Sequence, residues 1–238
     1  MAKGDIKKTR RDNMIESALK VFAQKGYSDA TMADISKEAG VSTPVLYEYF
    51  KTKEDLLFAI PDKYTKEPTR IMEFILPYIR GPEAKIRAIV QGHMTLYEQY
   101  PLYSYIVMLQ LKTNRNFMNT KSYQAIRKVA RILLESIREG IDDGTFKEDT
   151  DAFLIRSMIL GAIEHLCTRK ILVGEPKNLS VFVDPMIDVI LGGIKTRPKQ
   201  LTVNLGLQDS DITKIFGIEA LSSAEKTPSK KKAGRKTK

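Results

Sequence analysis

Apolar residues recur three and four positions apart along most of the chain, and alternating strand patterns are nearly absent before residue 200. This spacing predicts amphipathic helices. In the first segment Ile15, Ala18, Leu19 and Phe22 mark one helical face, and Gly26 follows as a C-cap residue. The pattern therefore predicts an all-α fold.

Two short helices are expected after this first one. Thr31 and Asp34 have the spacing of a capping box, which predicts a helix N-terminus. Residues 39–42 form a tight turn, in which Gly40 supplies a backbone conformation that other residues resist. The next helix is expected to begin at Ser42 or at the residue after it. Two short capped helices joined by such a turn predict a helix-turn-helix.

Longer helices are expected beyond this motif. Thr52 and Asp55 repeat the capping-box spacing and open a fourth helix, in which Pro61 and Pro68 predict a kink or a break. The further helices are expected at 83–100, 102–112, 117–141, 151–173 and 178–195. Residues 201–207 alternate like a strand, and the composition from about residue 224 predicts disorder.

The net charge of +10 is concentrated at the two ends of the chain. Residues 226–238 carry seven Lys or Arg and no acid, residues 1–53 sum to +3, and residues 54–225 sum to zero. This distribution favours a polyanion-binding head and tail around a domain with another task. The apolar stretches are far shorter than a membrane span, and the polar N-terminus lacks a secretory signal, so a cytoplasmic protein is expected.

Few residues of this sequence are suited to catalysis or metal binding. Cys167 is the single cysteine, and the chain has two histidines, which argues against a structural zinc site. No Gly-rich phosphate loop, His-Glu-x-x-His or Gly-x-Ser-x-Gly motif occurs. The sequence thus predicts no catalytic residue, no metal site and no cofactor.

The second helix of the motif has the chemistry of a helix that enters the DNA major groove. Its N-terminal residues Ser42, Thr43, Pro44 and Val45 are small, so they allow close approach to base edges. Thr43 is expected to donate or accept at a base, and Val45 to contact a thymine methyl. Tyr47, one turn further, is expected to bind a phosphate oxygen. Lys51 and Lys53 flank the start of the fourth helix, where lysine and a helix N-terminus form an anion site.

The pattern T-x-A-D-I-S-x-x-A-G-V-S-x-x-x-L-Y-x-Y-F-x-x-K-x-x-L-L runs from Thr31 to Leu57. Here the sequence resembles the tetracycline-repressor-type (TetR/AcrR) family of bacterial regulators, most closely between Met14 and Leu57. The resemblance implies an all-helical fold with a three-helix DNA-binding head and a larger antiparallel bundle that binds a small effector and dimerises. It implies base-facing positions for Thr43, Pro44 and Val45, and phosphate-facing positions for Thr31, Tyr47, Tyr49 and Lys53.

The resemblance also implies a division of the chain. Residues 1–53 are the expected DNA-binding domain and residues 54–197 the effector-binding and dimerisation domain, with dimerisation through about 151–173 and 178–195. A C-terminal extension (198–225) and a basic tail (226–238) follow. The two prolines fall where the family has one continuous helix joining the two domains, so they bear on how a signal crosses between them.

Several residues of the expected bundle are candidates for effector binding. Effector binding is expected within residues 83–175. The candidates are polar, aromatic or Met side chains on the predicted helices of this range: His93, Tyr97, Tyr100, Tyr103, Met108 and His165. Core packing is the alternative role of each, because aromatic and Met side chains fill cores as well as adaptable pockets. The apolar composition of the neutral middle domain predicts a hydrophobic effector, and a broad resemblance in spacing to lipid-metabolism regulators favours an acyl-CoA or fatty acid.

The functional prediction is a homodimeric repressor that binds operator DNA and is released by its effector. Its partners are double-stranded operator DNA, a second copy of the chain and a small hydrophobic effector, with no membrane, and its expected location is the nucleoid of a bacterial cytoplasm. Two alternatives come from other classes. One is a sequence-independent basic protein that compacts DNA, and the other is an enzyme built on a helical bundle.

Overall fold

A computed structural model describes residues 3–195 of the chain, with side chains from residue 9 onward. The expectations for residues 198–225 and for the basic tail at 226–238 lie outside the described residues. Within 3–195 the chain forms nine α-helices and no strand, which confirms the all-α class. The helices are α1 (Lys3–Lys25), α2 (Met32–Glu38), α3 (Thr43–Tyr49), α4 (Lys53–Ile75), α5 (Pro82–Gln99), α6 (Pro101–Ile106), α7 (Lys121–Asp142), α8 (Ala152–Val173) and α9 (Val183–Lys195). Four short turns of 3₁₀- or π-helix complete them: η1 (Leu76–Tyr78), η2 (Val107–Leu111), η3 (Phe117–Asn119) and η4 (Ser180–Phe182).

The first three helices and the start of α4 share a small apolar core. The predicted face of α1 is buried, with Ile15, Ala18 and Phe22 fully enclosed. Gly26 ends α1 with a φ of +80°, as its C-cap position requires. Both predicted capping boxes form, at Thr31 for α2 and at Thr52 for α4. Local sequence signals therefore set the boundaries of these helices, and burial of their apolar faces holds them together.

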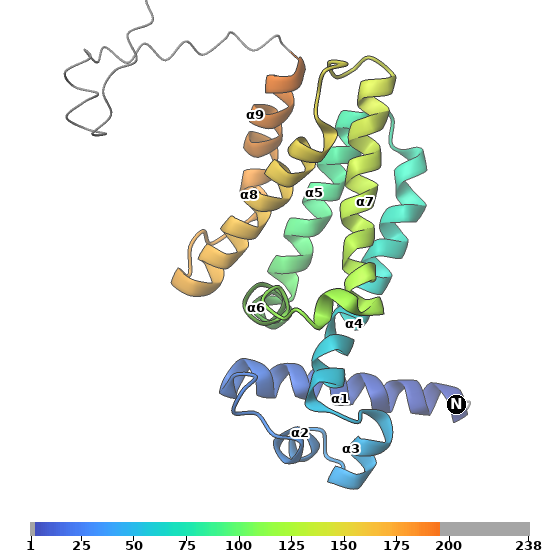
Figure 1. Cartoon of the computed structure of the whole chain (residues 1–238), viewed down its shortest axis with the longest axis vertical. Helices are drawn as coiled ribbons and strands as arrows, with labels where there is room; N and C mark the ends of the chain where they lie inside the picture. The colour runs from blue at the N-terminus through green and yellow to red at the C-terminus, as the bar shows by residue number, and fades with distance from the viewer. Residues whose placement is uncertain (1–2, 196–238) are drawn as a thin grey trace, which may run out of the picture. The chain divides into compact units, whose positions relative to one another are not determined.

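The long helix α4 is continuous from Lys53 to Ile75, so the break expected at Pro61 and Pro68 does not occur. Each proline removes one backbone donor and crowds the preceding turn, which disfavours an isolated helix. Here α4 packs against both α1 and α7, and Pro61 is itself buried. The Thr65 hydroxyl also donates to the Pro61 carbonyl at 2.8 Å. Packing thus outweighs the local cost of the prolines, and α4 runs unbroken from the head into the bundle (Figure 1).

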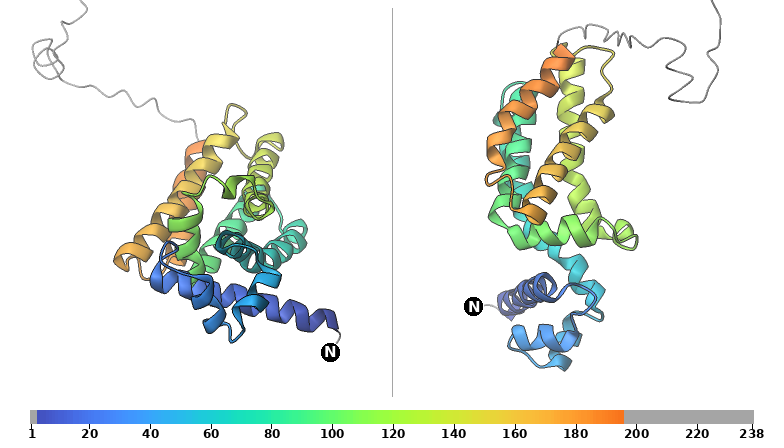
Figure 2. Two further views of the ribbon diagram at one scale, coloured as in Figure 1. Left: turned by 60° about the horizontal axis from the view of Figure 1, so that its bottom comes forward. Right: turned by 90° about the vertical axis from the view of Figure 1, so that its left-hand side faces the viewer.

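The remaining helices form an antiparallel bundle in which α5 lies among α7, α8 and α9 (Figure 2). Three expected boundaries differ from the structure. The predicted helix 102–112 is divided into α6 and the π-helical turn η2, and α7 begins at residue 121 behind the cap of Thr120. The last helix begins at residue 183, after η4, and the Glu98 carboxylate accepts hydrogen bonds from the Leu179 backbone and the Ser180 hydroxyl just before it. Of these three boundaries, the start of α7 has a local cap, whereas the segment before α9 contacts a side chain distant in sequence.

Two faces of the bundle carry exposed apolar side chains. On α8 and α9, Phe153, Leu154 and Val189 are between 54% and 77% exposed. A smaller group lies at the end of α4 and in η1, where Phe74 and Tyr78 are exposed. Among residues 3–195, no helix combines the length and the apolar character needed to cross a membrane.

Candidate nucleic-acid interface and ligand cavity

Helix α3 presents its N-terminal residues outward and anchors its other face in the head. Ser42, Pro44 and Tyr47 are exposed, whereas Leu46 is fully buried and Phe50 nearly so. Arg11 of α1 lies over the Phe50 ring, 5.0 Å from its centroid. The helix is therefore held rigidly from behind and offers a compact, small-residue edge on its open side, which is the shape needed for close approach to base pairs.

Two of the expected base-facing residues also serve the head itself. The Thr43 and Ser36 hydroxyls lie 2.9 Å apart, and the Ser36 hydroxyl donates to the Ala33 carbonyl. Thr43 is thus the donor to Ser36, which leaves its oxygen free to accept but not to donate at a base. Val45, which is expected to contact a thymine methyl, is half-buried and packs against the core. Tyr49, an expected phosphate ligand, is half-buried in the same way.

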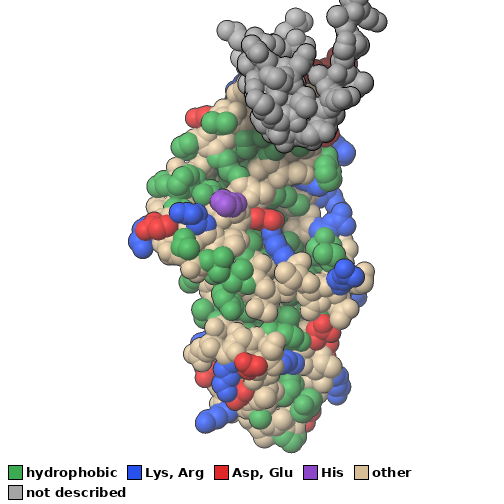
Figure 3. All heavy atoms as spheres, turned by 60° about the vertical axis from the view of Figure 1, so that its left-hand side comes forward, with side chains coloured by type: hydrophobic (Ala, Val, Ile, Leu, Met, Phe, Trp, Pro, Cys, Tyr) green, Lys and Arg blue, Asp and Glu red, His purple; other side chains and the backbone are tan. Residues whose placement is uncertain are grey.

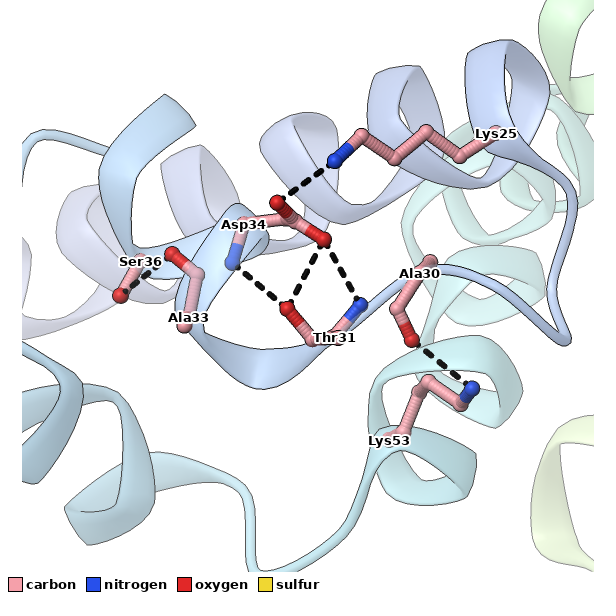
Figure 4. Close-up of polar contacts among 7 residues, drawn as sticks. All are labelled: Lys25, Ala30, Thr31, Ala33, Asp34, Ser36 and Lys53. Atoms are coloured by element: carbon pink, nitrogen blue, oxygen red, sulfur yellow. Dashed lines mark hydrogen bonds and ion pairs between the residues drawn. The ribbon is translucent and has the colours of Figure 1, made fainter.

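Lys53, for which the resemblance implies a phosphate contact, is directed at backbone carbonyls of the head. Its ammonium donates to the backbone carbonyls of Tyr27 (2.6 Å), Ser28 (3.0 Å) and Ala30 (2.8 Å), and it lies 4.6 Å from the Tyr27 ring centroid. Figure 4 shows the side chain reaching from α4 to the segment before α2. An ammonium has three donors, and all three are used here. The geometry therefore favours a structural role over the phosphate contact that the resemblance implies for Lys53.

Thr31 and Lys51 are both exposed. The Thr31 side chain caps α2 by accepting from the Asp34 backbone at 3.1 Å, and its hydroxyl donates to the Asp34 carboxylate at 2.8 Å (Figure 4). The hydrogen bonds from Lys25 and Thr31 lower the pKa of Asp34 to about 2, so this cap stays charged at neutral pH. Lys51 donates one hydrogen bond, to the Tyr47 carbonyl at 3.2 Å, and its ammonium has no other hydrogen bond among the described residues.

Two cavities lie inside the bundle and meet at His93 and Ile126, which line both. The inner cavity measures about 70 Å³ and the outer cavity about 330 Å³. The inner cavity is lined by α4, α5, α6 and α7 through Thr65, Pro68, Thr69, Met72, Ile89, Gly92, His93, Leu96, Tyr103, Ile126 and Val129. The outer cavity is lined by His93, Val107, Leu111, Lys112, Phe117, Met118, Tyr123, Ile126, Arg127, Ala130, Leu160 and Glu164. Both walls are mainly apolar, as is typical of small-molecule sites.

His93 is the polar group at the junction of the two cavities. Its Nδ1 atom is buried and has no hydrogen-bond partner among the described residues. Burial, and then the nearby charge of Lys112, lowers the pKa of His93 to about 4. The imidazole is therefore neutral at physiological pH, and it stacks on the Tyr97 ring with centroids 5.8 Å apart. A buried polar atom without a partner is costly unless something binds it.

The structure divides the other candidate effector residues into three groups. Tyr103 lines the inner cavity, and Tyr97 lies behind it with the rings stacked at 6.2 Å. Met108 is buried in the core and lines neither cavity. Tyr100 is 42% exposed and meets the Tyr64 ring edge-on, with the centroids 5.0 Å apart. His165 is exposed on α8, opposite the buried face of that helix. Neither Tyr100 nor His165 lines these two cavities, so the cavities do not support their assignment to the effector site, which stays a prediction.

Cavity residues on α4 escaped the sequence analysis. Thr65, Pro68, Thr69 and Met72 line the inner cavity, although effector binding was expected within residues 83–175. Gly92 also lines it, and a Cβ atom built there would lie 2.8 Å from the Met72 methyl. The predicted break in α4 obscured this contribution, since a continuous α4 is what brings residues 65–72 alongside α5.

The wall of the outer cavity is connected to the start of α4. Asn114 and Asn116 each donate a side-chain hydrogen bond of 3.2 Å to the Glu54 carboxylate. The rings of Phe58 and Phe117 lie 5.4 Å apart beside this contact, and Phe117 lines the outer cavity. The segment between η2 and α7 thus contacts both a cavity and the helix that enters the head.

Together, a helix-turn-helix with an open α3 face and a bundle with internal apolar cavities define a ligand-responsive DNA-binding regulator. The family model described as "Bacterial regulatory proteins, tetR family" matches residues 14–60. A second family model, described as "YsiA-like protein, C-terminal region", matches residues 71–193. The chain belongs to the TetR family of bacterial regulatory proteins. It is a transcriptional regulator of the repressor type.

Several relatives align over nearly their whole length. The fatty acid metabolism regulator protein of Bacillus subtilis is 25% identical over 191 residues, which cover 80% of this chain and 98% of that protein. The structure of a fatty acid degradation regulator from Bacillus halodurans has a TM-score of 0.71 at 25% identity, covering 79% of this chain and 97% of the other. The structure of the B. subtilis regulator FadR in complex with stearoyl-CoA has a TM-score of 0.66 at 27% identity, covering 76% of this chain and 98% of the other.

Proposed function

We propose that this protein is a homodimeric repressor that leaves its operator when a long-chain acyl-CoA binds inside the bundle. The observation that carries the proposal is the pair of apolar cavities that meet at His93 and Ile126. An acyl chain suits their walls, and the neutral imidazole supplies one polar group for a thioester or carboxyl oxygen. The stearoyl-CoA bound by the B. subtilis relative supports the same ligand class.

Operator contacts are assigned to the outer edge of α3. Pro44 and Tyr47 are exposed there, and the Thr43 oxygen retains its capacity to accept a hydrogen bond. In this proposal Ser42, Thr43, Pro44 and Val45 approach base edges, while Thr31, Tyr47, Tyr49 and Lys51 approach phosphates. Lys53 supports these residues by fixing the start of α4 against the segment before α2. Residues 1–53 would then act as the DNA-binding unit and 54–197 as the sensing and dimerising unit.

Dimerisation is assigned to α8 and α9. Helix α8 buries Ile159 and Ile163 against its own bundle, yet it exposes Phe153, Leu154 and Met158. A helix that is apolar on both faces usually has a partner on each. In Figure 3, where this side of the bundle comes forward, hydrophobic side chains are spread over the face. A second copy of the chain would cover them and would place two α3 helices on one pseudo-palindromic operator.

The ligand part of the proposal is tested by filling the inner cavity. Gly92→Leu places a branched side chain where even a Cβ atom already meets Met72. Palmitoyl-CoA is titrated into the complex of the full-length protein with an operator selected from genomic fragments, and release is followed by fluorescence anisotropy. The variant should hold the operator as the wild type does but need at least about tenfold more palmitoyl-CoA for release, a loss of about 1.4 kcal/mol in binding.

Ala84→Leu is the matched control, because Ala84 is exposed on the same helix and lines neither cavity. It should respond as the wild type does. Failure of palmitoyl-CoA to release wild-type protein would refute the proposed effector. Bulk DNA that competes as well as the selected operator would instead favour the sequence-independent DNA-compacting alternative.

A further inference from the structure

A polar groove of about 810 Å³ opens on the surface where α1, α4 and α7 meet. It shares two residues, Thr65 and Thr69, with the inner cavity. Both threonines are largely buried, at 5% and 8% exposure, so they form the boundary between the two spaces. The groove adjoins the inner cavity at Thr65 and Thr69, and the inner cavity adjoins the outer cavity at His93 and Ile126. We call these three connected spaces the passage.

The groove contains cations from all three helices. They are Arg11 of α1, Lys63, Lys66 and Arg70 of α4, and Lys128 of α7. Four carboxylates line the same groove, so its lining has one more cation than acid: Asp12, Asp62, Glu67 and Glu73. Lys128 pairs with Glu73 and Arg70 with Glu67, both at partly exposed positions where ion pairs contribute little. Lys66 is exposed and forms no ion pair among residues 9–195. Lys63 is less exposed and is paired with Glu16 at 2.7 Å. Lys66 is therefore a cation that a phosphate entering the groove would meet without breaking an ion pair.

The other end of the passage is less suited to an anion. The outer cavity has two cations, but Lys112 is paired with Glu164 and the Arg127 guanidinium lies over the Tyr123 ring. Its wall also contains the apolar side chains of Phe117, which is buried, and Met118, which is exposed. A ligand with one charged and one apolar end is therefore best accommodated with the charged end in the groove and the apolar end toward the outer cavity.

The passage is narrow in its middle, at the inner cavity. Its width there depends on Met72, whose terminal methyl packs against Gly92. A Met side chain is unbranched and adapts its rotamers at modest cost, so Met72 is able to move aside for an alkyl chain. The free imidazole nitrogen of His93 lies further along the same path.

We propose that the groove between α1, α4 and α7 binds the phosphate-bearing head of the effector while its acyl chain passes between Thr65 and Thr69 into the cavities. This inference rests on the proposed function and adds the place and chemistry of the head. It also gives the head a direct regulatory contact, because Arg11 belongs to the DNA-binding unit and Lys128 to the bundle. A ligand that touches both units has a differential affinity for their arrangements, which a conformational response requires.

The test compares two ligands that differ only in the head. Palmitoyl-CoA carries phosphates, whereas palmitoyl-pantetheine has the same chain and thioester without them. Binding to the full-length protein is measured by isothermal titration calorimetry at two salt concentrations. Lys66→Glu and Lys128→Glu, from two different helices, should each weaken palmitoyl-CoA about tenfold and palmitoyl-pantetheine less than about twofold, and the salt dependence of palmitoyl-CoA binding should decrease.

Lys121→Glu reverses a charge at the start of α7 outside the groove and is the matched control. Retained binding of palmitoyl-pantetheine shows that each variant is folded. Equal effects of Lys66→Glu on the two ligands, or no effect on either, would overturn the assignment of the head to the groove while leaving an acyl-binding repressor in place. Absence of binding of both ligands to the wild type would remove the proposed function and this inference together.

Discussion

His93 is a half-buried histidine whose imidazole is neutral at physiological pH. Its Nδ1 atom lacks a partner, and its ring faces both cavities. The pKa of about 4 is below the ordinary value of 6.5, so the unfolded chain binds a proton in a pH range where the folded protein does not. This difference links a residue of the candidate ligand site to the stability of the whole fold.

The stability of the protein should therefore fall as pH decreases from about 6.5 towards 4. Between pH 7 and pH 5, His93 alone should account for about 2 kcal/mol of the lost free energy of unfolding. His93→Phe preserves the ring stacked on Tyr97 but cannot titrate, so its loss over the same interval should be smaller by that amount. Urea unfolding at the two pH values measures the difference.

His165→Gln is the control for this measurement, because it removes a histidine that is exposed on α8. It should keep the pH dependence of the wild type. An identical pH dependence of wild type and His93→Phe would contradict the assignment of the buried, neutral imidazole.

At the scale of elements, α4 connects the helix-turn-helix head to the helical bundle. Its start is fixed by Lys53 to three carbonyls before α2, and Glu54 accepts hydrogen bonds from two asparagines between η2 and α7. Its middle lines the inner cavity through Thr65, Thr69 and Met72. A displacement of α4 at the cavity therefore acts on a helix whose first turn is bonded to the head.

Replacing Lys53 by Met should destabilise the protein, since it leaves the carbonyls of Tyr27, Ser28 and Ala30 without their donor. Hydrogen bonds to a charged donor predict a loss of about 2 kcal/mol in the free energy of unfolding. Operator affinity should decrease with it, because α3 loses its fixed position relative to α4. Lys51→Met, two residues earlier, removes one contact to a carbonyl and should cost less than about 0.5 kcal/mol.

Urea unfolding and operator titration of the two variants check this prediction. A Lys53→Met protein as stable as the wild type but weaker in operator binding would show that Lys53 contacts phosphate, as the resemblance implies. Equal losses for both lysines would point to net charge as the common cause.

At the scale of the whole molecule, the exposed apolar residues of α8 and α9 are the feature that a single chain leaves unexplained. Val189 is 77% exposed and Phe153 61% exposed, yet both belong to helices whose other faces are packed. Burial of such a face yields roughly 25 cal/mol per Å² of apolar area. Association through this face would also fix the distance between two α3 helices, which an operator with two half-sites requires.

If α8 and α9 form the proposed dimer interface, Val189→Glu should leave the protein monomeric at micromolar concentration. A charge at the centre of an apolar interface should raise the dissociation constant at least about 100-fold, or about 2.7 kcal/mol. Analytical ultracentrifugation measures the oligomeric state, and operator affinity should fall in parallel. Phe74→Glu places the same charge on the exposed apolar group at the end of α4 and should remain dimeric.

The prediction is refuted if Val189→Glu remains a dimer. A monomeric Phe74→Glu would transfer the interface to α4 and η1.

The sequence by itself determined the helical class, the helix-turn-helix and the boundaries set by local chemistry. Thr31 and Asp34, Gly26 and Gly40 act within one turn of the chain, so their capping and left-handed conformations need no distant partner. The buried face of α1 followed from periodicity for the same reason. The DNA-facing assignments remain predictions, since they depend on a partner as well as on the chain.

Tertiary structure decided what depends on packing between distant segments. Two prolines predicted a broken α4, but contacts with α1 and α7 keep it continuous, and this continuity brings Thr65, Thr69 and Met72 to the cavity. Packing likewise directs His93 inward and leaves His165 exposed, and it places Lys53 among three carbonyls. Helical periodicity gives every such side chain a face, but only the neighbouring helices determine whether that face meets a cavity, a core or water.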